Sequence, residues 1–92
     1  MRFKFAALMM TLAAAACVSS SGAVVSGAGP DDLLKLRKGP GLHHEIIIGL
    51  PDGTRLTRHN CMTTNGKLWC RVTLTARPSL SGYVAAEYLA DR

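Results

Sequence analysis

Three cysteines carry the clearest chemistry in this chain of 92 residues. Cys61 and Cys70 lie at equal distances on either side of Asn65-Gly66. Asn-Gly favours a two-residue type I′ turn, because both central positions need φ > 0. Counting outward from that turn puts Cys61 opposite Cys70 in a non-hydrogen-bonded pair, where Cα atoms approach to about 4.5 Å. That separation suits a disulfide, so the sequence predicts a stapled β-hairpin and an oxidising compartment. The same count pairs Thr64 with Lys67, Thr63 with Leu68 and Met62 with Trp69.

The third cysteine, Cys17, comes after a segment that has the features of an export signal. Arg2 and Lys4 give it a positive start, and residues 5–16 are an apolar run too short to span a bilayer. Two interpretations remain open. Residues 12–17 resemble a bacterial lipobox, in which case Cys17 is lipidated and becomes the mature N-terminus. Alternatively, an ordinary signal peptidase cuts at a site with small residues, either 21–23 (Ser-Gly-Ala) or 26–28 (Ser-Gly-Ala). Both leave Cys61 and Cys70 to pair with each other.

Length and composition limit the remainder of the chain to one small domain. We expect residues 1–28 to comprise the signal and a flexible linker over Cys17–Ala28, and residues 29–92 to form the domain. From Gly29 to Arg92 there are nine Lys/Arg and six Asp/Glu, a net charge of +3. These charges are scattered, and nothing shows the alternation of basic and aromatic residues that binds nucleic acid. Membrane contact is expected only through a lipid on Cys17.

Histidines are the candidate metal ligands. His43, His44 and His59, with Glu45 nearby, could suggest a zinc site. Adjacent histidines on an extended segment point to opposite sides, which is poor geometry for chelation. The sequence therefore predicts no metal and no cofactor.

Other polar residues do not form a catalytic arrangement. Ser79 and Ser81 lie in no nucleophile elbow and no recognisable triad, and Asp31-Asp32 are expected to be solvated at the start of the domain. We therefore expect no enzymatic activity. The scattered cations have two possible roles: they are part of a solvated surface, or they form a weak site for a peptide carboxylate or an anionic lipid. These cations are Arg37, Lys38, Arg55, Arg58 and Arg71.

Short apolar stretches separated by turn signals predict an all-β domain. Residues 46–50 and 54–61 flank the turn Pro51-Asp52-Gly53. In residues 68–75 every second residue is apolar, a pattern that predicts a strand with one buried face. Leu56 is at an even position and Cys61 at an odd one, so strict alternation would put their side chains on opposite faces of the strand. A bulge is therefore expected within residues 57–60. A loop over 76–81, a short strand at 82–84 and a helical turn at 85–89 complete the expected domain.

These elements, in this order, resemble the bacterial Src-homology-3 (SH3) domain, from about residue 33 to residue 89. The segments that carry the resemblance are Leu36-Arg37-Lys38-Gly39-Pro40-Gly41, Ile46 to Leu50, Leu50-Pro51-Asp52-Gly53-Thr54, Gly66 to Trp69-Cys70-Arg71-Val72, Gly82-Tyr83-Val84 and Tyr88-Leu89. The resemblance implies a small five-stranded, partly open SH3-like barrel with a long first loop and a shallow groove. It also implies an exported module that binds peptides, often cell-wall peptides, or that tethers partners in the envelope.

Four residues are the candidates for such a groove. Trp69 is expected to be exposed, because it alternates with Leu68 and Cys70, and it would either anchor a ligand or cover an edge of the core. Tyr83 and Tyr88 would line the same groove, with packing beside Leu89 as the alternative for Tyr88, and Arg37 would add a positive charge.

The resulting functional hypothesis is a non-enzymatic envelope module that binds peptides or peptidoglycan peptides. The alternative is an accessory interaction domain or inhibitor in the periplasm with no affinity for the cell wall. The protein would be periplasmic, secreted or anchored as a lipoprotein, and the sequence does not decide its oligomeric state.

Overall fold

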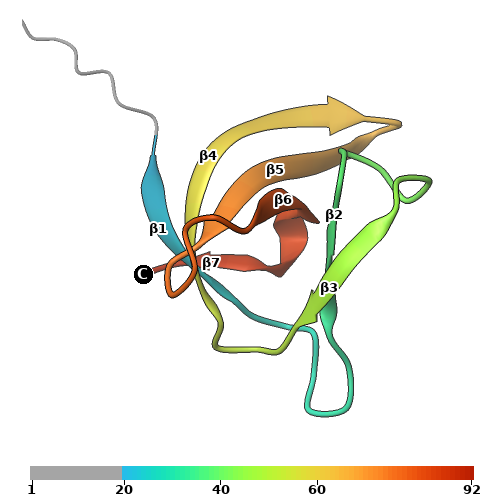
Figure 1. Cartoon of the computed structure of the whole chain (residues 1–92). Helices are drawn as coiled ribbons and strands as arrows, with labels where there is room; N and C mark the ends of the chain where they lie inside the picture. The colour runs from blue at the N-terminus through green and yellow to red at the C-terminus, as the bar shows by residue number, and fades with distance from the viewer. Residues whose placement is uncertain (1–19) are drawn as a thin grey trace, which may run out of the picture.

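The computed structural model describes residues 20–92, which form one antiparallel sheet curled around a small core (Figure 1). Its elements are β1 (Ser21–Val25), β2 (Leu34–Arg37), β3 (Ile46–Leu50), β4 (Arg55–Thr64), β5 (Lys67–Leu74), β6 (Ser81–Ala85), the 3-10 helix η2 (Ala86–Tyr88) and β7 (Leu89–Asp91). The strand order across the sheet is β3-β2-β6-β5-β4-β1-β7. Side chains from β1 to β6 meet in a single buried cluster, which requires a strongly curved sheet. That cluster is Val25, Leu34, Leu36, Leu50, Leu56, Cys70, Val72 and Val84.

The β4–β5 hairpin has the turn and the register that the sequence predicts. Asn65 and Gly66 have φ of 51° and 79°, as a type I′ turn requires. Cys61 faces Cys70, and the three pairs nearer the turn agree with the predicted count. The expected bulge is also present, since the register shifts between Arg58 and Cys61. The resulting curvature lets β4 pair with β1 through its first residues and with β5 along its length.

Seven strands replace the five that were expected, and the additional ones are β1 and β7. The prediction that residues 17–28 form a flexible linker is wrong for Ser21–Val25, because this segment is a strand between β4 and β7. Ala23 and Val25 are 0 % and 2 % exposed. The folded unit therefore begins before residue 29. The predicted signal and lipobox at residues 1–17 lie outside the described residues.

The C-terminal part has the expected order of loop, strand and helical turn. Residues 75–80 form the loop, β6 comes next, and η2 brings Tyr88 and Leu89 against the core. β7 then pairs with β1 and is the last strand at that end of the sheet. No helix within residues 20–92 is long and apolar enough to cross a membrane.

Candidate binding groove

A groove of about 280 Å³ lies along β2. It is lined by β2, the connection between β1 and β2, Leu42 of the β2–β3 loop, the first residues of β5, the last residue of β6, and η2. Figure 1 shows the tip of the β4–β5 hairpin on the same side of the molecule as the β2–β3 loop. The type I′ turn fixes the direction of that tip, so the groove depends on local hairpin geometry.

Trp69 lines the groove, but it is not the exposed platform that the sequence predicts. Only 3 % of the residue is exposed, whereas Leu68 is 47 % exposed. Alternation does place Trp69 and Cys70 on opposite faces of β5, and both are buried. The face of β5 that carries Trp69 borders the groove and is not open to solvent. Trp69 therefore forms part of the base of the groove, and a ligand would contact it only at its edge.

Tyr88 also lines the groove, and it is half-buried because it packs on the core as well. The backbone N–H of Ser26 donates a hydrogen bond to the Tyr88 carbonyl oxygen at 2.9 Å. This bond ties η2 to the segment after β1, whose Gly27 and Ala28 also line the groove, with Gly27 beside the Tyr88 ring. Tyr83 does not line the groove, since it sits in the middle of β6, opposite Arg37 and Arg71 in the neighbouring strands.

Three cationic side chains line the groove, at Lys35, Arg37 and Lys67. Arg37 Nη1 donates to the carbonyl oxygens of Leu42 and His44, both at 3.0 Å, and so supports the β2–β3 loop from inside. Lys67 pairs with Glu87 at 3.1 Å across the hairpin tip and η2. The side chains of Lys35 and Lys67 are each about two-fifths exposed, so either lysine can turn towards a negatively charged ligand.

One carboxylate, Asp32, shares the groove with these cations. The backbone N–H of Leu33 and then the ammonium of Lys35 hold the pKa of Asp32 below its ordinary value. Asp32 is thus charged at neutral pH and partly offsets the lysines. With Glu87, which pairs with Lys67, counted beside Asp32, three cations face two carboxylates at the groove, a net charge of +1.

The remaining candidate residues lie away from the groove or are engaged elsewhere. The rings of His43 and His44 lie side by side, with centroids 4.2 Å apart, so the prediction that they point apart is wrong. The reason is that the β2–β3 loop is a tight turn here and not an extended segment. His59 bonds Thr73 Oγ1 at 2.8 Å on the sheet.

Within residues 20–92 no three His, Cys, Asp or Glu side chains are grouped as metal ligands would be. Ser79, in the loop before β6, and Ser81, the first residue of β6, are exposed, and Asp31 is exposed with Asp32. The scattered cations form no stripe. Lys38 pairs with Glu45, Arg58 pairs with Asp91, and Arg71 Nε donates to Asn60.

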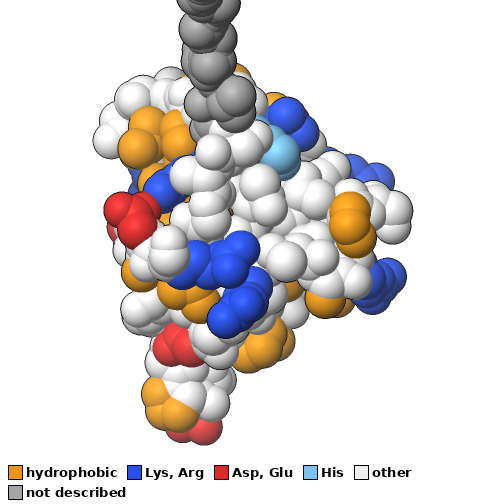
Figure 2. Space-filling model, turned by 90° about the vertical axis from the view of Figure 1, so that its left-hand side faces the viewer, with side chains coloured by type: hydrophobic (Ala, Val, Ile, Leu, Met, Phe, Trp, Pro, Cys, Tyr) orange, Lys and Arg blue, Asp and Glu red, His pale blue; other side chains and the backbone are white. Residues whose placement is uncertain are grey.

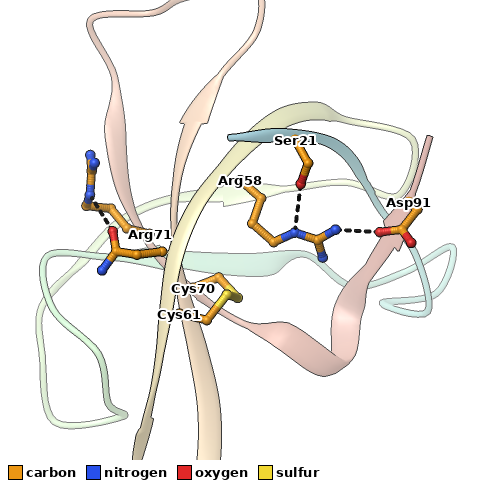
Figure 3. The surroundings of a disulfide bond; sticks show 7 residues. Ser21, Arg58, Cys61, Cys70, Arg71 and Asp91 are labelled. Carbon is orange, nitrogen blue, oxygen red and sulfur yellow. Dashed lines mark hydrogen bonds and ion pairs between the residues drawn. A yellow bond between two sulfur atoms is a disulfide. The ribbon is translucent and has the colours of Figure 1, made fainter. Parts of the chain in front are cut away.

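The Cys61–Cys70 disulfide forms as predicted and joins β4 to β5 (Figure 3). The two Cα atoms are 4.0 Å apart, consistent with the close spacing of a non-hydrogen-bonded pair. Cys70 is 1 % exposed and belongs to the core, while Cys61 is exposed. Since Trp69 directly precedes Cys70, the bridge holds in place the strand that supplies the base of the groove.

Comparison with known proteins identifies the family of the domain. The family model of the bacterial SH3 domain matches residues 32–90. The chain belongs to this family, whose members are generally non-catalytic binding modules. No curated protein and no solved structure matches the chain. The matched region starts after β1, so β1 is an element that the family match does not cover.

Proposed function

We propose that this protein is an exported, non-enzymatic module that binds an extended peptide in the groove over Trp69, with cell-wall peptides as the ligand class. The observation that carries this proposal is the combination of an aromatic and aliphatic lining with three cations in one groove. Apolar contacts would supply affinity and the cations would select a carboxylate. Cell-wall peptides offer both features, because they carry small apolar side chains and free carboxylates.

The volume of the groove supports a short ligand. About 280 Å³ is just below the range of about 300–1,000 Å³ for small-molecule pockets. It accommodates one or two side chains and their backbone, and it is too small for a folded partner. Recognition of an extended segment on a shallow aromatic groove is one of the recurring modes of peptide binding.

Export is the second part of the proposal. The disulfide supports it, because such bonds persist in oxidising compartments and are rare in the cytosol. The predicted signal supplies the route, and the two interpretations of Cys17 give either an envelope lipoprotein or a periplasmic or secreted protein.

A pair of leucine substitutions tests the groove without disturbing the core. Leu42 lines the groove and is 71 % exposed, whereas Leu68 is 47 % exposed and outside the lining. We expect Leu42→Ser to weaken retention on purified peptidoglycan by about five-fold, corresponding to about 1 kcal/mol of lost contact. Leu68→Ser should bind like the wild type. Equal retention of all three proteins would reject this groove as the binding site, and no retention of the wild type would reject the proposed ligand class.

A protein partner is the alternative function, and the observation that favours it lies on edge strand β3. Ile46, Ile47 and Ile48 are 37–47 % exposed on a strand that pairs only with β2. Exposed β-branched residues at a sheet edge favour contact with another chain. Crosslinking in cells that captures one protein and is lost in Ile47→Asn, but kept in Leu42→Ser, would support this alternative.

A further inference from the structure

We propose that residues 20–29 remain in the mature protein and that export processing cuts the bond between Ala16 and Cys17. This inference rests on the export that the proposed function includes. It selects one processing site from the three regions that the sequence offers. The contacts of β1 and of the segment directly after it carry the inference.

β1 is an interior strand of the sheet. Its residues pair with β4 from Ser21 opposite Arg58 to Val24 opposite Arg55, and its other edge pairs with β7. Val25 belongs to the main core cluster and is 2 % exposed. Interior strands with a buried face contribute to stability through both their ladders and their side chains.

Side chains also fasten β1 to its two neighbours. Arg58 on β4 donates through Nε to Ser21 Oγ at 3.3 Å and through Nη2 to the carboxylate of Asp91 on β7 (Figure 3). The side chain of Arg92 lies against Gly22. Figure 2 shows this face, on which Lys and Arg side chains gather around the middle. The two strands on either side of β1 are thus linked across it.

The segment after β1 is held as firmly and contributes to the groove. Val25 exchanges backbone hydrogen bonds with the β3–β4 turn, to Thr54 O at 3.0 Å and from Gly53 N at 2.8 Å. The N–H groups of Ala28 and Gly29 donate to the two oxygens of Asp52 at 2.9 and 3.0 Å. Gly27 and Ala28 line the groove together with Tyr88.

Two of the three candidate processing sites would destroy this arrangement. A cut after Ala23 would divide β1, and a cut after Ala28 would remove it together with one lining of the groove. The first product would lose the pairs that residues 21–23 make with β4. The second would expose the edges of β4 and β7 to solvent and leave a void at the position of Val25. A small domain with a limited core tolerates such losses poorly.

The bond between Ala16 and Cys17 is the remaining site, and its sequence suits processing. Ala14-Ala15-Ala16 supplies the small residues, and Cys17 is the residue that a lipobox requires. Hydrolysis consumes one water and leaves a carboxylate on Ala16 and an α-amine on Cys17.

Intact mass of the protein recovered from the envelope tests the inference. We expect a chain that begins at Cys17, with or without an added diacylglyceryl group. A chain that begins at Val24 or Gly29 would overturn the inference while leaving export intact. A chain of full length that stays in the cytoplasm would contradict export itself, so the two failures are distinguishable.

Neighbouring valines give a second test that does not depend on the mass of the N-terminus. Val25 is buried and Val24 is only half-buried. In the exported protein, Val25→Ala should lower the melting temperature by about 5–15 °C, and Val24→Ala should lower it much less. Melting temperatures equal to the wild type in both variants would show that β1 is absent from the mature protein and would refute the inference.

Discussion

Removal of the Cys61–Cys70 bridge is expected to be one of the most destabilising single changes in this protein. The bond closes a loop with a sequence separation of 9. The chain-entropy relation then gives a loss of about 2.6 kcal/mol at 25 °C when the bond is opened. For a domain of this size, such a loss lowers the melting temperature by about 10–20 °C. That is a large share of the stability that a small core provides.

The assay compares thermal unfolding of the oxidised and reduced protein, in a Cys17→Ser background that prevents exchange with the third cysteine. Cys61→Ser is the first variant, because Cys61 is exposed while Cys70 is part of the core. Reductant should lower the melting temperature of the parent to that of Cys61→Ser and should leave the variant unchanged. If complete reduction, verified by mass, does not change the melting temperature of the parent, a stabilising role for the bridge is refuted.

Three further predictions concern the core and the groove walls, each measured by chemical denaturation. Trp69→Ala should cost about 3–5 kcal/mol, because the indole is buried, whereas the exposed neighbour Leu68→Ala should stay within about 0.5 kcal/mol; equal effects would contradict the burial of Trp69. Gly82→Ala should cost about 1–3 kcal/mol, since its Cβ would lie 2.6 Å from the Arg37 carbonyl oxygen. Gly22→Ala is its control, because there the new methyl meets only the flexible Arg92 side chain, and a tolerated Gly82→Ala would count against this packing. Asp52→Ala should lower the free energy of unfolding by about 1 kcal/mol, because it removes the acceptor of the backbone hydrogen bonds from Ala28 and Gly29. The control Asp31→Ala, at an exposed position, should change this free energy little, and equal effects of the two variants would argue against the Asp52 anchor.

Local rules were sufficient for the central hairpin. The preference of Asn65-Gly66 for positive φ fixed the turn, and the turn fixed the register that brings Cys61 opposite Cys70. The difference in parity between Leu56 and Cys61 located the bulge. These features depend on residues close together in the chain, where sequence patterns are most informative.

Features that depend on distant contacts could not be predicted in the same way. Trp69 alternates with Cys70 as expected, but the segments that cover its face come from β1–β2 and η2, far away in the sequence. The sequence of β1 has the appearance of a linker, because its small residues resemble a signal cleavage region. The β-branched pair Val24-Val25 was the available signal, and a strand of five residues is too short to outweigh the composition.

Titration of the single tryptophan tests the central claim most directly. Trp69 is the one Trp of the chain and lines the groove, so its fluorescence reports occupancy without a label. With soluble cell-wall peptides we predict a saturable change in the wild type and in Leu68→Ser, and a half-saturation concentration about five-fold higher in Leu42→Ser. An absent response, or identical curves for all three proteins, would contradict peptide binding in this groove.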